Sequence, residues 1–151
     1  MPKLIRDGAI IEDDWLPVAS EPAAGRIRTL QQWLQLVDKS GSAVQVEPGE
    51  GVEDLLQSLD DIVLVAVNFP ALTDGRGFSY GRELRERGFP GELRATGAFM
   101  RDQMTYLARV GFNAFQLADE TDLPDALASL HDFSESYQAS VDQPLPLFRR
   151  R

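Results

Sequence analysis

The residues best suited to bind a ligand follow the most apolar segment of the chain, residues 62–69. Residues 74–79 read Asp-Gly-Arg-Gly-Phe-Ser, so two glycines flank Arg76 just before a helical pattern. Backbone N–H groups at a helix start attract anions, and a guanidinium binds an oxyanion through two parallel hydrogen bonds. The segment lacks the Gly-Lys-Ser/Thr of a phosphate-binding Walker loop, and its glycine spacing is one residue too long for a dinucleotide fingerprint. The alternative is that the glycines only make turns and Arg76 is solvated.

A second glycine-bearing connection, residues 95–98, leads into Arg101, Asp102 and Gln103. Arg101 comes early in the expected helix and could face the same edge of the sheet. Asp102 is more simply a first-turn acid that complements the helix dipole. Arg94 precedes this connection, although the alternation of side chains along a strand opposes its reaching the loops. The candidate anion-binding residues are therefore Asp74, Gly75, Arg76, Gly77, Ser79, Arg94, Arg101, Asp102 and Gln103.

Other chemistry is restricted by composition. The chain has no cysteine and a single histidine, His131, which excludes thiolate nucleophiles, disulfides, cysteine-ligated clusters and multi-histidine metal sites. His131 is expected near the end of the last helix as a C-terminal cap. The acids of residues 118–122 could ligate Mg²⁺, but acidic residues at a helix start usually serve the dipole, and we expect no metal. No catalytic constellation is found, so an enzymatic activity is left open.

Charge is unevenly distributed along the sequence. The net charge of −9 over 151 residues argues against binding to nucleic acid or to a membrane surface. Residues 76–109 nevertheless carry seven arginines against four acids, a local cationic excess that would attract small anions or an acidic partner. Within this window Arg82, Arg85 and Arg87 are interpreted as an ordinary solvated helix face.

The elements at the start of the chain follow from turn and capping signals. Asp7-Gly8 between two short apolar runs predicts a β-hairpin, and residues 17–25 are typical of a loop. Thr29 with Gln32 predicts a capping box, followed by a helix whose apolar face extends from Leu30 to Val37. A short amphipathic helix is expected over residues 52–59.

The remaining elements alternate between strand and helix. Strands are expected at 43–46, 62–69, 91–95 and 113–117, and helices at 79–87 (with Ser79 as N-cap), 99–109 and 123–133. The continuous apolar run 62–69 is typical of a strand buried on both faces of a parallel sheet. The sequence thus predicts an α/β fold with a four-stranded, mainly parallel sheet, arranged either as half of a βα barrel or as a small doubly wound sheet.

The whole chain, 1–151, is expected to form one domain, with an N-terminal hairpin at 1–16, an α/β core at 27–133 and a C-terminal tail at 134–151. No apolar run approaches the roughly 20 residues needed to span a bilayer, and no leader pattern is present, so a cytoplasmic location is expected.

Five short motifs occur in order along the chain: residues 1–8 (Met-Pro-Lys-Leu-Ile-Arg-Asp-Gly), 74–79, 91–95 (Gly-Glu-Leu-Arg-Ala), 101–103 and 111–115 (Gly-Phe-Asn-Ala-Phe). Together they resemble an uncharacterised bacterial family that is commonly encoded beside the sulfite reductase haemoprotein of assimilatory sulfate reduction. That family is labelled as oxidoreductase without an established mechanism. The resemblance implies a role in sulfite reduction or cysteine biosynthesis, and it implies that Asp74, Arg76, Ser79, Arg94, Arg101, Asp102 and Gln103 matter together.

Three functional hypotheses follow. The first is an accessory protein of sulfite reduction that binds the reductase haemoprotein or a small anion through an arginine-bearing face. The second is an enzyme or sensor that binds a small oxyanion or a phosphorylated metabolite at the βα loops. The third and weakest is electron transfer, which would need a bound flavin or similar cofactor because the chain has no cysteine to hold an iron–sulfur cluster. No flavin fingerprint is found in the sequence.

Overall fold

The computed structural model describes residues 2–70, 76–97, 99 and 101–140, with only the backbone described at 101, 102 and 132–140. The chain opens with the predicted hairpin, formed by β1 (Lys3–Arg6) and β2 (Ala9–Glu12). Its turn residues Asp7 (φ 52°) and Gly8 (φ 81°) both adopt the left-handed conformation that a tight two-residue hairpin turn requires.

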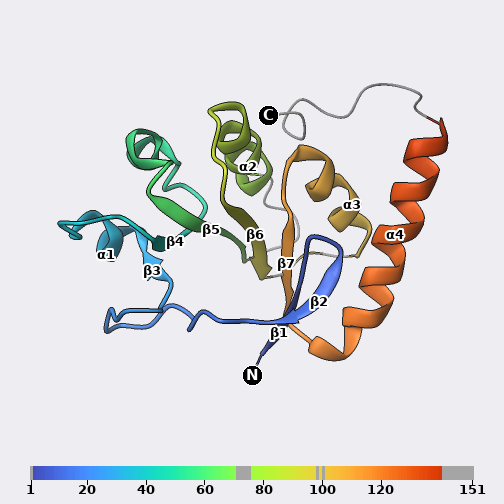
Figure 1. Ribbon diagram of the computed structural model, residues 1–151, viewed down its shortest axis with the longest axis horizontal. Helices are drawn as coiled ribbons and strands as arrows, with labels where there is room; N and C mark the ends of the chain where they lie inside the picture. Colours follow the sequence, from blue (N-terminus) through green and yellow to red (C-terminus); the bar gives the residue numbers. More distant parts are fainter. Residues whose placement is uncertain (1, 71–75, 98, 100, 141–151) are drawn as a thin grey trace.

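A single sheet organises the molecule (Figure 1), and it is larger than predicted. The strands β3 (Arg28–Thr29), β4 (Ser42–Val46), β5 (Ile62–Phe69), β6 (Glu92–Gly97) and β7 (Ala114–Leu117) run parallel to one another in chain order. The hairpin adds to β7 through antiparallel pairing of β1, which gives seven strands in the order β2-β1-β7-β6-β5-β4-β3. The α/β class and the mainly parallel pairing are confirmed, whereas the count of four strands is corrected to seven.

All helices of the described part lie on one face of this sheet. They are α1 (Leu30–Leu34), α2 (Arg76–Glu86), α3 (Arg101–Val110) and α4 (Leu123–Ser140), with short 3₁₀ turns η1 (Glu53–Ser58) and η2 (Glu120–Asp122). Their apolar side chains share one core with Val65, Val67 and Leu93 of the sheet. The described helices therefore do not flank the sheet on both faces, as they would in a doubly wound sheet. None of the helices in the described ranges is long and apolar enough to cross a membrane.

The first helix is shorter than its apolar pattern predicted. The capping box is present, because Thr29 Oγ1 accepts a hydrogen bond from the Gln32 N–H at 3.2 Å and Gln32 Oε1 accepts from the Thr29 N–H at 3.0 Å. Helix α1 nevertheless ends at Leu34, and Val37 beyond it is fully exposed instead of facing the core. The prediction of a common buried face through Val37 was therefore wrong.

Helix α2 begins three residues earlier than predicted, at Arg76, so Ser79 lies inside the helix and is not its N-cap. Gly77 and Gly81 are not turn residues either. A β-carbon at Gly77 would come within 2.5 Å of the Phe69 ring, and one at Gly81 would collide with the Phe112 ring. These glycines let α2 pack directly against the sheet and its neighbours, which fixes where the helix starts above the carboxyl end of β5.

The other face of the sheet is crossed by residues 13–27, which we call the strap. Because the hairpin and β3 lie at opposite edges of the sheet, the strap must run from one edge to the other, as Figure 1 shows. It packs Trp15, Val18 and Ile27 against Ala43 and Leu64 in a small second core. The sheet thus has helices on one face and the strap, whose residues Leu16 and Arg26 pair across a loop, on the other.

Candidate functional site

The carboxyl ends of β4, β5, β6 and β7 lie side by side, as the pairing of these strands requires. We call this line of strand ends the carboxyl edge of the sheet. In folds built from parallel βα units, ligands bind at this edge, on the loops that leave the strands. Helix α2 begins here after β5, and α3 begins here after β6. The structure therefore brings the starts of α2 and α3, which follow the two predicted glycine-bearing connections, to the edge where a ligand site is expected.

Arg76 is the first residue of α2 and its side chain is exposed. Its Nη1 atom lies 3.3 Å from the position that a β-carbon on Gly49 would take, so the guanidinium sits beside the loop that follows β4. The same loop is held by Tyr80 of α2, whose hydroxyl accepts a hydrogen bond from the Gly49 N–H at 2.8 Å. Arg76 thus extends over the carboxyl edge between β4 and β5.

The other predicted site residues lie in different places. Ser79 is exposed one helical turn after Arg76, and Gln103 is half-buried in the first turn of α3. Arg101 and Asp102 are the first two residues of α3, and only their backbone is described. Asp74 and Gly75 lie outside the described residues. Gly77 packs against Phe69 and Val67 of β5, as described above.

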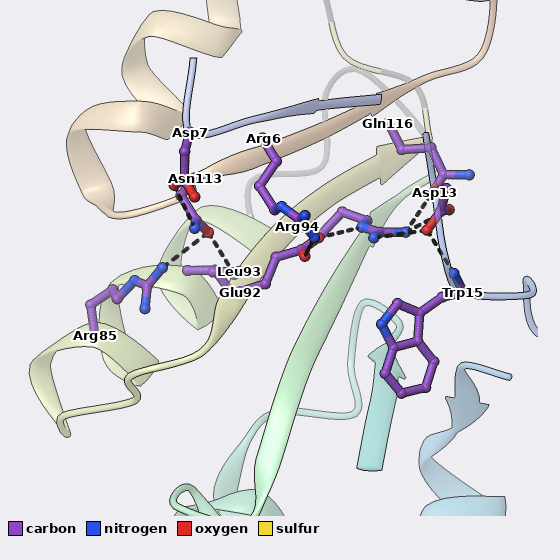
Figure 2. A network of polar contacts seen from close by, with 10 residues as sticks. All are labelled: Arg6, Asp7, Asp13, Trp15, Arg85, Glu92, Leu93, Arg94, Asn113 and Gln116. Carbon is purple, nitrogen blue, oxygen red and sulfur yellow. Dashed lines mark hydrogen bonds and ion pairs between the residues drawn. The ribbon is translucent and has the colours of Figure 1, made fainter. Parts of the chain in front are cut away.

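Arg94 does not join this group. Its side chain is fully buried on the strap face of β6 (Figure 2), where Nη1 and Nη2 hold Asp13 Oδ2 and Oδ1 at 3.0 and 3.2 Å. Its Nε donates to Glu92 Oε2 at 2.8 Å, and Nη1 also donates to Gln116 Oε1 at 3.3 Å. A guanidinium engaged in this way fastens the strap to the sheet. Arg94 is therefore corrected from a candidate anion ligand to a structural ion-pair residue.

The ion-pair network around Arg94 is electrically balanced. Arg6 Nη1 binds the second oxygen of Glu92 at 3.0 Å, so two arginines face two carboxylates. The Asp13 carboxylate also accepts from the Trp15 N–H at 3.0 Å, which sets the direction in which the strap leaves the hairpin. Buried charges are tolerated when each is paired and hydrogen-bonded in this way.

Arg85 also departs from the prediction, since it is not part of a solvated helix face. It is half-buried and donates to the carbonyl oxygens of Phe89, Gly91 and Gly111 at 2.8–2.9 Å, and to Asn113 Oδ1 at 3.2 Å. Burial lowers the pKa of its guanidinium, and the negative charge of Asp7 partly opposes that effect. Arg85 ties α2 to the loops at the amino end of the sheet. Arg82 and Arg87 are exposed, as predicted.

The two remaining singled-out regions have structural roles. His131 is not a helix cap: it lies within α4, and its Nε2 atom bonds the Gly8 carbonyl at 3.1 Å, which holds the hairpin turn against the helix. Asp119 caps η2 by accepting from the Thr121 hydroxyl and N–H at 2.7 and 2.9 Å, and these hydrogen bonds lower the pKa of Asp119.

A row of polar side chains was missed by the sequence analysis. Strand register aligns Asn68, Thr96 and Gln116 across β5, β6 and β7, and Glu47 continues the row just beyond β4. All four side chains are half-buried and lie on the strap face, because their neighbours along each strand point into the helix-covered core. The row stands at the carboxyl ends of the strands, above Arg94. The available signal was a polar residue in the next-to-last position of each of the strands β5, β6 and β7.

The fold defines a βα protein with its described helices on one face of the sheet and the carboxyl ends of its parallel strands aligned. Comparison with known families identifies the chain further. It belongs to the family described as a bacterial protein of unknown function (DUF934), whose sequence model matches residues 43–148. No curated protein matches the chain. The matched span contains the parallel strands from β4 to β7 and the helices α2 and α3.

Proposed function

We propose that the protein is an accessory protein of assimilatory sulfite reduction that binds a small oxyanion at the carboxyl edge of its parallel sheet. The observation that supports this most is the common location of two helix starts, each opening with an arginine, Arg76 in α2 and Arg101 in α3. Helix N-termini offer unpaired N–H groups and a positive dipole end to an anion. The pathway is proposed from the resemblance to the family encoded beside the reductase.

The proposal is tested first by calorimetry against sulfite, sulfate and adenylyl sulfate. Replacing Arg76 by alanine should reduce the affinity for the bound anion by roughly ten-fold or more, because a hydrogen bond to a charged group contributes about 1.5–3 kcal/mol. Because the Arg76 side chain is exposed, the urea unfolding midpoint should change little. Arg82→Ala is the matched control, since Arg82 is an exposed arginine of the same helix that donates to Tyr106 Oη. If none of the three anions binds, or if both variants bind alike, the anion site is wrong.

The pathway and the partner are tested separately. The Arg76→Ala chain should fail to restore growth in a sulfite-assimilation defect, whereas the Arg82→Ala chain should restore it. A pull-down with the sulfite reductase haemoprotein then distinguishes an accessory protein that binds the enzyme from a sensor that binds only the anion. Full complementation by Arg76→Ala would remove Arg76 from the function.

A further inference from the structure

The polar row on the strap face contains a carboxylate whose partners are all neutral. Glu47 Oε1 accepts from the Asn68 amide at 2.7 Å, and Glu47 Oε2 accepts from the Gln45 amide at 2.8 Å. Within the described ranges, no lysine, arginine or histidine forms an ion pair with Glu47. This contrasts with Asp13 and Glu92 on the same face, which both bind arginines. A half-buried carboxylate that is hydrogen-bonded only to amides favours the binding of a cation.

The hydrogen-bond directions around Glu47 leave acceptors unoccupied. An ionised carboxylate can only accept, so the amide groups of Asn68 and Gln45 must turn their NH₂ ends toward it. Their carbonyl oxygens therefore face elsewhere. Each carboxylate oxygen has a further lone pair beyond the one that its amide partner uses. The Glu47 carboxylate thus keeps free acceptor positions on both oxygens, which matches a group with several donors and a positive charge.

The Asn68 side chain lies against Gly97, at a place where a β-carbon on residue 97 would collide with it. Gly97 at the end of β6 has φ +102°, and a β-carbon there would lie 2.6 Å from Asn68 Oδ1 and 2.5 Å from the Phe69 carbonyl oxygen. Thr96 and Gln116 continue the row on the next two strands at the same register. Gln116 Oε1 accepts from Arg94, so its NH₂ end remains as a donor at the far end of the row.

We propose that Glu47, Asn68 and Thr96 form a binding site for a small molecule that carries a primary ammonium group, with Gln116 donating to an acceptor on the same molecule. A metal ion is less suited to this site, because the two amides direct their NH₂ groups, not their oxygens, at the carboxylate. The inference does not rest on the oxyanion proposal, since its residues lie on the other face of the sheet from the helices and include no arginine.

The experiment is a titration of the ¹⁵N-labelled full chain with ethanolamine and, in parallel, with ethylene glycol, in which a hydroxyl replaces the ammonium. Ethanolamine should give saturable amide shifts at Asn68, Thr96 and Gly97, including the Asn68 side-chain NH₂, and ethylene glycol should give none. Equal shifts with both compounds, or saturable shifts confined to other regions, would overturn the assignment. So would the absence of any saturable shift with ethanolamine.

Variants test the individual groups. Glu47→Gln should weaken ethanolamine binding by roughly ten-fold or more, because it removes the only charge of the row. Glu86→Gln is the control, since it makes the same chemical change at an exposed position at the end of α2. Thr96→Val keeps the shape of the side chain and should weaken binding several-fold, so it tests the row even if Glu47→Gln loses its fold. The oxyanion proposal is measured by calorimetry with sulfite, sulfate and adenylyl sulfate, so either proposal can fail without the other. Wild-type affinity in both Glu47→Gln and Thr96→Val would contradict the site.

Discussion

The two faces of the sheet are built on different principles. On the helix face, Leu93 and Ala95 of β6 are buried in an apolar core with the helices. Between them, Arg94 points to the strap face and is just as completely buried, but among carboxylates and amides. Apolar packing is non-directional and tolerates many arrangements, whereas paired charges demand one geometry. The helix face therefore holds the fold together, and the strap face determines where one particular segment lies.

The polar pairs of the strap face join parts of the chain that are far apart. Arg94 and Asp13 are 81 residues apart in sequence, and Arg6 and Glu92 are 86 apart. The match to the family covers residues 43–148, so Arg94 and Glu92 lie within the matched span, whereas Asp13 and Arg6 precede it. The hairpin and strap are attached to the matched region through these ion pairs, the small apolar core, the pairing of β1 with β7, and hydrogen bonds of the Asp7-Gly8 turn to Asn113 and His131.

The largest effect in this comparison is expected at Arg94. Arg94→Met leaves Asp13 buried without its cation, and breaking a buried pair in this way costs about 3–5 kcal/mol of unfolding free energy. Urea denaturation of the full chain measures the loss. The double variant Asp13→Leu, Arg94→Met should recover part of it, because both charges are then removed from the interior. A single variant as stable as the wild type would show that the strap is held by the apolar contacts alone.

An element of the fold could be predicted from the sequence where the residues that determine it are close together in the chain. The Asp7-Gly8 turn, the Thr29 capping box and the β5 strand are each specified within a few residues, and each was predicted correctly. Strand β3 has only two residues and forms by pairing with β4, so it leaves no pattern of its own. The one-sided placement of the helices could not be chosen either, because periodicity says which face of a helix is apolar but not which side of the sheet it covers.

The candidate site was predicted less well, for the same reason. The carboxyl edge and the starts of α2 and α3 follow from the order of elements, and they lie where the rule for parallel sheets puts them. Arg94 was included because it precedes a glycine-bearing connection, yet its direction is set by strand alternation and its partner comes from the other end of the chain. The row containing Glu47 and Asn68 is created by strand register, which no single segment of sequence displays.

A smaller effect is expected from disturbing the helix face. Gly77→Ala places a methyl group against the Phe69 ring and Val67, so α2 must move away from β5. Overpacking of this kind costs about 1–3 kcal/mol. Ser79→Ala in the same helix is the control, and it should change the unfolding free energy by less than about 0.5 kcal/mol because Ser79 is exposed. If the two variants unfold at the same urea concentration, the close approach of α2 to the sheet does not require glycine at position 77.

The smallest effect is expected at Arg6, which shares the Glu92 carboxylate with Arg94 but is more exposed. The Arg6 side chain is 37% exposed, against 1% for Arg94. Ion pairs that reach solvent contribute about 0–1 kcal/mol and weaken as salt is added. Arg6→Met should therefore lower the unfolding free energy by less than about 1 kcal/mol, and the difference from the wild type should shrink at high salt. Both arginines bind the Glu92 carboxylate, but Arg94 also holds Asp13, so the difference between the two losses measures burial together with this second ion pair. A loss at Arg6 as large as that at Arg94 would mean that the whole network acts as one unit, and the distinction between a buried and a solvated pair on this face would fail.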